Sequence, residues 1–285
     1  RGAATLGPMA PSDPDPDPDT GGDVTADAGR RIRREPPRFR SVTVRQVTHE
    51  HARLVRLTLG GPDLDGFLVA DPASSVRLLV PWPGEELVEP TWTGNEFLLA
   101  DGRRPALRTL TPLAAAGPLE LDVAVVLHGG GAVSGWAARA RPGDRASISG
   151  PGRGHHLDPA AEDHVLAGDE SALPAIGQLL EALPAGARAR VHVEVADEVA
   201  VVPLPNPAAS VVRWHRLGPG ARPGDALVAA VAACELTAGS RVWVAGEAAA
   251  VQRIRRHLFD ERGIGRAQAT VRGYWKHGRE GGDDG

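Results

Sequence analysis

The sequence predicts two domains of different class, an antiparallel β-barrel followed by an α/β domain built on a parallel sheet. Apolar and polar residues alternate with period two in segments between residues 39 and 127, as half-buried strands require. After residue 154, short apolar segments alternate with helical ones, which indicates strands joined by crossover helices. We therefore expect a barrel of six to seven strands at residues 37–154 and the α/β domain at residues 155–285.

The first 36 residues differ in composition from both domains. They are rich in Gly, Pro and Asp, and Asp alternates with Pro from Asp13 to Asp19. Residues 1–29 hold six Asp and one Arg, so the total charge of −4 leaves +1 for residues 30–285. Like charges and few apolar residues predict a disordered tail at residues 1–36. The near-neutral remainder gives no basic face for nucleic acid, and we expect no such partner.

Three features of the sequence bear on the cellular compartment and on membrane association. No run of 18 apolar residues occurs, so we expect no membrane span. Cys234 is the single cysteine and has no intrachain disulfide partner. The start of the sequence lacks the charged and apolar regions of a secretory signal, so we expect a cytoplasmic protein.

The barrel strands follow from apolar alternation between Gly, Pro and Asp turns. They are expected at residues 39–45, 54–59, 76–80, 96–99, 107–111, 119–127 and 145–149. Between the last two, Gly129, Gly130 and Gly131 allow a tight turn and a close approach of the backbone to a ligand. A helix expected at residues 132–140 would direct its unpaired N-terminal N–H groups at an anion. The Gly-Pro-Gly run at 150–152 indicates the domain boundary.

The α/β pattern places its ligand site at the carboxyl ends of parallel strands. Strands are expected at residues 165–167, 189–195, 211–215, 241–245 and 269–273, with helices at 172–183, 225–234 and 247–262. The turns at that edge are 168–171 and 246–247. Neither contains G-x-G-x-x-G, so the long glycine loop of dinucleotide folds is absent.

Four blocks resemble the siderophore-interacting proteins, the flavin-dependent ferric-siderophore reductases of the ferredoxin-reductase-like superfamily. The blocks are LHGGGAVSGWAARARPGDRASISGPG (127–152), LAGDESALPAI (166–176), WVAGEAAAVQRIRRHL (243–258) and GYWKHGR (273–279). With their spacing they cover the chain from about residue 37 to its end. The resemblance implies an FAD-binding barrel, a C-terminal domain that binds NADH or NADPH, and a ferric siderophore as substrate.

The family's flavin motif, Arg-x-Tyr-Ser/Thr, is matched here by Arg108-Thr109-Leu110-Thr111. The resemblance places Arg108 at the pyrophosphate of FAD and Thr111 at the flavin ring. Leu110 replaces the aromatic residue, and losing that packing costs on the order of 1 kcal/mol. A flavin-free protein that keeps the fold and binds a siderophore or a partner is therefore the alternative.

The resemblance also implies the binding residues. On the FAD side they are Arg108, Thr111, His128, Gly129, Gly131, Ala132 and Ser134; on the nicotinamide side Gly168, Asp169, Glu170, Ser171, Gly246 and Glu247; and at the flavin edge Tyr274 and Trp275. Because many ferric siderophores are anionic, the basic residues Lys276 and Arg279 near that edge are the expected siderophore contacts. Arg103 and Arg104 are further basic residues expected near an anionic siderophore.

Several of these residues have a structural alternative. His128 is either a phosphate ligand or a hydrogen-bonded turn residue. Asp169 and Glu170 either bind the nucleotide or cap the following helix. Tyr274 and Trp275 either border the flavin or anchor the C-terminal segment, and Trp136 either packs on the barrel or stacks on a ligand.

The implied reaction requires no catalytic side chain, and we nominate none. Hydride passes from nicotinamide to flavin N5, and the flavin then delivers single electrons to Fe(III), whose hard oxygen ligands hold Fe(II) less firmly. A metal-binding protein that uses His155-His156, or His49 and His51, is a third hypothesis, although these histidines lack Cys or carboxylate partners at ligand spacing.

Overall fold

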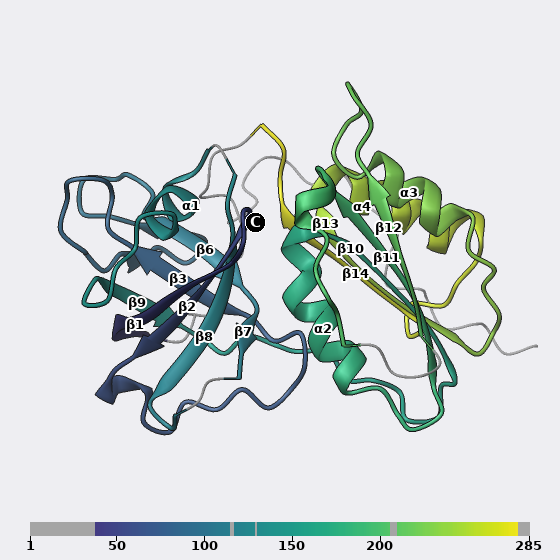
Figure 1. Cartoon of the computed structure of the whole chain (residues 1–285), viewed down its shortest axis with the longest axis horizontal. Coiled ribbons are helices and arrows are strands. Elements are labelled where there is room, and N and C mark those ends of the chain that lie inside the picture. The colour runs from purple at the N-terminus through teal and green to yellow at the C-terminus, as the bar shows by residue number, and fades with distance from the viewer. Residues whose placement is uncertain (1–37, 115–116, 129, 206–209, 279–285) are drawn as a thin grey trace, which may run out of the picture.

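The computed structural model describes residues 38–114, 117–128, 130–205 and 210–278. Within these ranges the chain forms two domains side by side, with the barrel and the parallel sheet clearly separate (Figure 1). The tail predicted at residues 1–36 lies outside the described residues, as do Gly129 and Arg279.

The first domain is a seven-stranded antiparallel sheet in the order β6-β3-β9-β1-β2-β8-β7. Strands β6 and β7 lie at opposite edges of this order, yet only Thr111 separates them in sequence. The sheet therefore curls into a barrel, as predicted. Its strands are β1 (Phe39–His51), β2 (Leu54–Gly60), β3 (Val76–Val80), β6 (Ala106–Leu110), β7 (Pro112–Leu113), β8 (Glu120–Val126) and β9 (Arg145–Ser149).

The period-two pattern fills the barrel interior. Val55, Leu57 and Leu59 of β2 lie opposite Val125, Val123 and Leu121 of β8, and all six are buried. One predicted strand does not join this sheet: the segment predicted at 96–99 forms a separate two-stranded ribbon, β4 (Thr91–Trp92) with β5 (Phe97–Leu98). The two short strands pack their aromatic rings on each other: the ring centroids of Trp92 and Phe97 lie 5.1 Å apart.

The second domain is a five-stranded parallel sheet in the order β12-β11-β10-β13-β14, which confirms the predicted α/β class. Helix α2 packs on one face with one apolar cluster, and α3 and α4 pack on the other face with a second cluster (Figure 1). The elements are β10 (Asp163–Asp169), α2 (Leu173–Glu181), β11 (Arg188–Val195), β12 (Val211–Arg216), α3 (Asp225–Ala232), β13 (Ser240–Glu247), α4 (Ala248–Arg256) and β14 (Ala269–Trp275), with 3₁₀ helices η2 (Glu170–Ala172) and η3 (Glu198–Ala200). A further 3₁₀ helix, η1 (Pro62–Leu64), belongs to the barrel domain.

All four α-helices of the described residues are shorter than predicted, and α2 and α3 each end two residues before the predicted ends at residues 183 and 234. Helix α1 (Ala132–Ala137) was expected to reach residue 140, but Arg139 N–H bonds the carbonyl of Trp136 three residues back, so the chain tightens there. The helix expected at 247–262 is α-helical only to Arg256. A π-helical segment, η4 (His257–Glu261), follows, and Arg262 N–H donates to the carbonyl of His257 five residues earlier.

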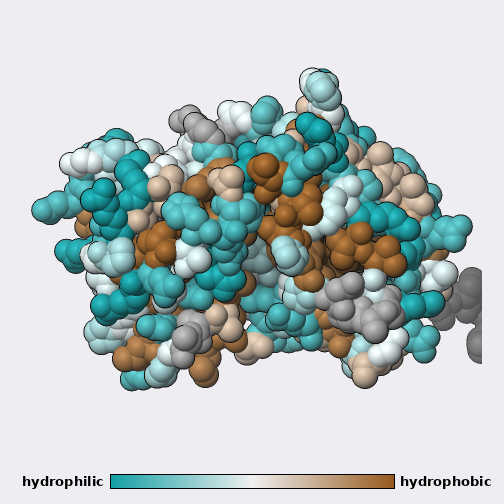
Figure 2. All heavy atoms as spheres, viewed as in Figure 1, coloured by the Kyte–Doolittle hydropathy of each residue, from teal (hydrophilic) through white to brown (hydrophobic). Residues whose placement is uncertain are grey.

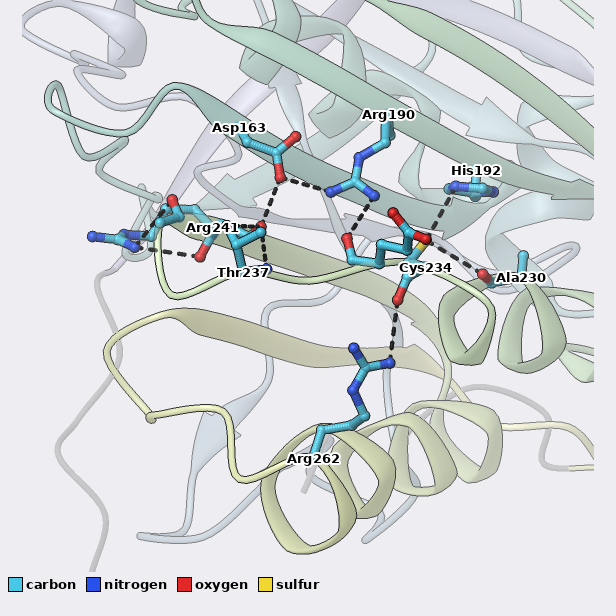
Figure 3. A network of polar contacts seen from close by, with 11 residues as sticks. Asp163, Arg190, His192, Ala230, Cys234, Thr237, Arg241 and Arg262 are labelled. Atoms are coloured by element: carbon cyan, nitrogen blue, oxygen red, sulfur yellow. Dashed lines mark hydrogen bonds and ion pairs between the residues drawn. The ribbon is translucent and has the colours of Figure 1, made fainter.

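The amino ends of the parallel strands are joined by a polar network (Figure 3). Asp163 accepts hydrogen bonds from Arg190 Nη2 at 2.6 Å and from Ser240 Oγ at 2.7 Å, which links β10 to β11 and β13. Cys234 Sγ lies 3.4 Å from His192 Nε2, and Arg262 donates to the Cys234 carbonyl at 3.2 Å. These contacts hold the strands and helices of one domain together.

Apolar residues on the face shown in Figure 2 gather over α2 and the segment beside it, whereas the barrel half is mainly hydrophilic. Among the described residues, no helix is long and apolar enough to cross a bilayer. In the same ranges no group of three or more His, Cys, Asp and Glu side chains is arranged to hold a metal ion.

Candidate functional site

An anion cradle lies at one end of the barrel and consists of Arg108 on β6, His128 after β8 and Gly131 before α1. Gly131 has φ 87°, and a Cβ there would lie 3.2 Å from His128 Cε1 and 3.9 Å from Arg108 Nη2. Two segments, strand β6 and the turn between β8 and α1, therefore meet around a gap that a side chain at residue 131 would fill. Glycine is required both by this gap and by the positive φ.

Ser134 fixes the turn of the anion cradle. Its hydroxyl donates to the His128 carbonyl and accepts from the His128 N–H, both at 3.0 Å, and the residue is 5% exposed. Ala132 is the first residue of α1 and follows Gly131 directly. The predicted residues Arg108, His128, Gly131, Ala132 and Ser134 are thus brought together, and Ser134 shapes the turn.

The charge of the anion cradle comes from arginine. Burial lowers the pKa of His128 below its ordinary 6.5, and the nearby positive charges of Arg108 and Arg53 lower it further. His128 is therefore neutral at neutral pH, with one ring N–H to donate. No carboxylate in the described ranges forms a salt bridge with Arg108, so its guanidinium is available to an anion.

Across from the barrel, Asp169 ends β10 and accepts four hydrogen bonds. Oδ1 accepts from Ser171 N–H at 2.9 Å and Ser171 Oγ at 2.5 Å, and Oδ2 accepts from Glu247 N–H at 2.9 Å and Trp275 Nε1 at 2.7 Å. Burial raises the pKa of Asp169, and these uncharged donors oppose the shift. Asp169 thus caps η2, as the structural alternative states, and it also joins η2 to β13 and β14.

The glycines of the same edge are explained by close packing. A Cβ on Gly246 would come within 2.6 Å of Asp169 Oδ2, and a Cβ on Gly168 would overlap the Cβ of Ala172. Both glycines let the backbone approach its own neighbours. Their contact with a nucleotide stays a prediction.

Glu247 and Glu170 are also held by protein groups. Glu247 caps α4 by accepting from Ala250 N–H at 2.8 Å, and its other oxygen accepts from His277 N–H at 3.1 Å. Glu170 accepts from Arg53 Nε and from Ala196 N–H, both at 2.7 Å. The carboxylates expected to bind nicotinamide are therefore engaged in fixing this edge of the sheet.

The C-terminal strand β14 borders the barrel through its aromatic residues. Burial raises the pKa of Tyr274, whereas neighbouring Arg272 and Thr111 lower it, so the buried Thr111 of the flavin motif lies beside the Tyr274 hydroxyl. Tyr274 also packs edge-on against Trp243 at 6.3 Å. With Trp275 bound to Asp169, both aromatic residues anchor the strand in the way the structural alternative describes.

The remaining predicted residues differ in their surroundings. Trp136 is 6% exposed within the barrel core, so the packing interpretation is confirmed, and Leu110 packs against the same core. Lys276 is exposed directly after β14. Arg103 forms ion pairs with Glu85 and Asp101, and Arg104 with Glu96, so their charges are compensated locally. Arg279 and Gly129 lie outside the described residues.

Two residues that link the domains were missed by the sequence reasoning, Arg53 and Gln178. Gln178 donates from Nε2 to the Pro112 carbonyl at 2.6 Å and accepts from Ala73 N–H at 2.9 Å. Arg53 lies in the β1–β2 turn and Gln178 within a helix, and no motif distinguishes either residue. Their contacts span more than 60 positions, so sequence spacing carries no signal for them.

Comparison with known proteins agrees with this geometry. Residues 30–155 match the siderophore-interacting FAD-binding domain, and residues 161–278 match the siderophore-interacting protein model. Ferric vibriobactin reductase ViuB of Vibrio cholerae is 32% identical over 233 residues, covering 79% of this chain and 85% of that protein. NADPH-dependent ferric-chelate reductase of Escherichia coli is 38% identical over 149 residues, covering 51% of this chain and 58% of that protein.

Among solved structures, a siderophore utilization protein from T. fusca superposes with a TM-score of 0.75 at 35% identity, covering 86% of this chain and 95% of that one. Both domain models match in the expected order, and together they span nearly all described residues. The chain therefore belongs to the siderophore-interacting protein family, with a ferredoxin-reductase-like fold.

Proposed function

We propose that the protein is an FAD-dependent reductase of ferric siderophores that uses NADH or NADPH and releases Fe(II) in the cytoplasm, where these nucleotides are available. The observation that carries the proposal is the anion cradle, in which His128 and Arg108 both lie within 4 Å of the position that a Cβ on Gly131 would take, inside the FAD-binding family match. The names of the ferric-chelate and ferric vibriobactin reductases support the same class of reaction.

The residues of the anion cradle fit a diphosphate. Arg108 supplies a charge without a carboxylate partner in the described ranges, and Gly131 keeps the space in front of it open. The first N–H groups of α1 and the neutral ring of His128 add hydrogen-bond donors. Thr111, next to Tyr274, is the group proposed to face the flavin ring.

FAD bound here would supply the conversion between a two-electron hydride and two one-electron transfers, one to each of two ferric ions. The chain's own residues have other tasks. Arg108 binds and orients the diphosphate. Asp169 holds Trp275 at the edge between the domains, and Glu247 holds the backbone of His277, the residue after Lys276. No side chain has to donate or accept a proton at the iron complex.

Lys276 and Arg279 are the proposed contacts to an anionic siderophore. Lys276 is exposed beside the interdomain edge and carries a formal positive charge. Lys276→Gln should raise KM for an anionic ferric complex and leave KM for a neutral complex within about twofold, because only the anion loses an attractive charge. Equal changes for both complexes in steady-state assays would contradict this assignment.

The deciding experiment is an absorbance titration of the purified protein with FAD, followed by anaerobic addition of NADH or NADPH and then of a ferric siderophore. Three results would support the reductase: saturable FAD binding, loss of the flavin absorbance on addition of NADH or NADPH, and formation of two Fe(II) for each reduced flavin. The second candidate, a flavin-free binding protein, is favoured by Leu110 in the aromatic position of the flavin motif. A protein that takes up no FAD but binds the siderophore would establish it.

A further inference from the structure

The segment η2–α2, residues 170–181, is fastened to the barrel at two points. At its start Glu170 accepts from Arg53 of the β1–β2 turn, and in its middle Gln178 bonds Pro112 and Ala73 of the barrel domain. All three contacts join residues of different domains. The segment directly follows β10, whose carboxyl end is where an α/β sheet binds its ligand.

The first point is a partly buried ion pair. Arg53 Nε and Glu170 Oε2 are 2.7 Å apart, with side-chain exposures of 27% and 10%. The second Glu170 oxygen accepts from Ala196 N–H, so the carboxylate is fixed from both domains. The Arg53 carbonyl accepts from Leu127 N–H at 2.8 Å, which ties this point to the chain immediately before His128 of the anion cradle.

The second point uses both halves of one amide group. Gln178 Nε2 donates to Pro112 O and Gln178 Oε1 accepts from Ala73 N–H, at 2.6 and 2.9 Å. Pro112 directly follows Thr111, the residue proposed to face the flavin ring. Ala73 is 1% exposed and has φ 53°, a conformation that alanine adopts only where its surroundings hold it.

We propose that Glu170 and Gln178 are positioning residues that fix the α/β domain against the barrel and so set the distance over which hydride is transferred. The inference rests on the proposed function. Transfer between two bound reactants depends on their separation at the level of about 1 Å. The segment 170–181 follows the strand end at which the nucleotide is proposed to bind. Its first contact ties it to the chain just before the anion cradle, and its second ties it to Pro112, which follows Thr111.

The contacts themselves are tested in the flavin-free protein by residue-resolved amide hydrogen exchange. Gln178→Ala should speed amide exchange at Ala73 on the order of tenfold, and Glu170→Ala should speed it at Ala196 by a similar factor. Each substitution removes the oxygen that accepts that N–H. Gln252→Ala on the exposed face of α4 and Glu181→Ala at the end of α2 are the matched controls and should change neither rate. Unchanged rates at both amides in the test variants would overturn the proposal.

The positioning role is tested by rapid reduction of the FAD-loaded protein. Gln178→Ala and Arg53→Gln should lower the rate constant of flavin reduction about ten- to hundredfold, with KM for the nucleotide and Kd for FAD within about twofold. Arg53→Lys, which keeps the charge, should recover part of the rate. A raised KM with an unchanged rate constant would overturn the positioning role and indicate nucleotide binding instead.

The two experiments, amide exchange and rapid flavin reduction, distinguish failure of this proposal from failure of the proposed function. If neither NADH nor NADPH reduces the wild-type flavin, the proposed function fails and the role in hydride transfer fails with it. Amide exchange at Ala73 still decides whether the Gln178 contact joins the two domains. Arg53→Gln serves as the second variant at the first point, because Arg53 is partly exposed and its loss leaves the Glu170–Ala196 bond intact.

Discussion

The barrel half and the sheet half of the candidate site are built in opposite ways. In the barrel half, Arg108 has no carboxylate partner in the described ranges, and the gap before it is kept open by Gly131. In the sheet half, Asp169, Glu170 and Glu247 each accept two or more hydrogen bonds from the protein itself. We therefore propose that the barrel half binds a ligand, whereas the carboxylates of the sheet half bond other parts of the protein.

This difference assigns different consequences to mutation. A carboxylate already satisfied by neutral donors has little capacity left for a nucleotide, so its loss should first lower the free energy of unfolding. An arginine with open space before it contributes little to folding, so its loss should first weaken FAD binding. A nucleotide bound at the sheet half would therefore contact backbone and aromatic groups whose positions the carboxylates fix.

The largest expected effect is that of Asp169→Asn on stability. An asparagine side chain has one acceptor oxygen, so in either orientation two of the four donors to Asp169 face an NH₂ group. We expect the free energy of unfolding of the flavin-free protein to fall by about 2–4 kcal/mol, measured by urea denaturation. Ser171→Ala, which removes one donor, should cost less. A loss of unfolding free energy below about 1 kcal/mol for Asp169→Asn would contradict the structural role of the sheet-half carboxylates.

The next effect is that of Arg108→Gln on FAD affinity. Loss of charge-assisted bonds worth about 1.5–3 kcal/mol should raise Kd for FAD roughly 10- to 150-fold in a fluorescence titration. The stability of the flavin-free protein should change by less than about 0.5 kcal/mol. Arg145→Gln, at an exposed position of β9, is the control and should leave Kd unchanged. A large stability loss without a change in Kd would give Arg108 the structural role.

A smaller effect is expected in the pH dependence of FAD binding. Burial, with Arg108 and Arg53, holds the pKa of His128 below 6.5 in the free protein, and a bound diphosphate would raise it again. Binding then takes up a proton in the window between the two pKa values. Affinity should rise as pH falls through this window, by at most about tenfold per pH unit, and level off below the pKa of the free protein.

His128→Gln should remove that slope while keeping a hydrogen-bonding side chain at the position. The measurement is Kd for FAD at several pH values in wild type and variant. An identical slope in both proteins would show that another group binds the proton.

The sequence predicted the barrel half better than the sheet half, for a physical reason. Arg108, His128 and Gly131 belong to local motifs whose strands and turn are recognisable, and the curling of the sheet brings β6 close to the end of β8. The partners of the sheet-half carboxylates lie far along the chain: Trp275 is 106 residues from Asp169 and Arg53 is 117 residues from Glu170. Such pairs depend on how whole domains pack, which no residue spacing records.

The same reasoning accounts for the errors in element boundaries. Alternation at 96–99 indicated a strand correctly, but only packing decides that it pairs with Thr91–Trp92 and not with the barrel. The helix predicted to residue 262 continues its apolar pattern past Arg256, because a π-helical turn keeps Leu258 buried and changes only the hydrogen-bond spacing.

The smallest expected effect tests whether the barrel half is complete. Leu110 lies two residues after Arg108 on the same strand, opposite Val76, and is only partly buried against the barrel core. Leu110→Tyr should tighten FAD binding by roughly 0.5–1.5 kcal/mol, about three- to tenfold, if the ring stacks offset on the flavin. The same gain should appear in the Arg108→Gln background, because ring stacking and diphosphate binding are independent contributions at separate parts of FAD. No FAD binding by wild type, and none gained by Leu110→Tyr, would leave Arg108 without a flavin to bind and would favour the flavin-free binding protein.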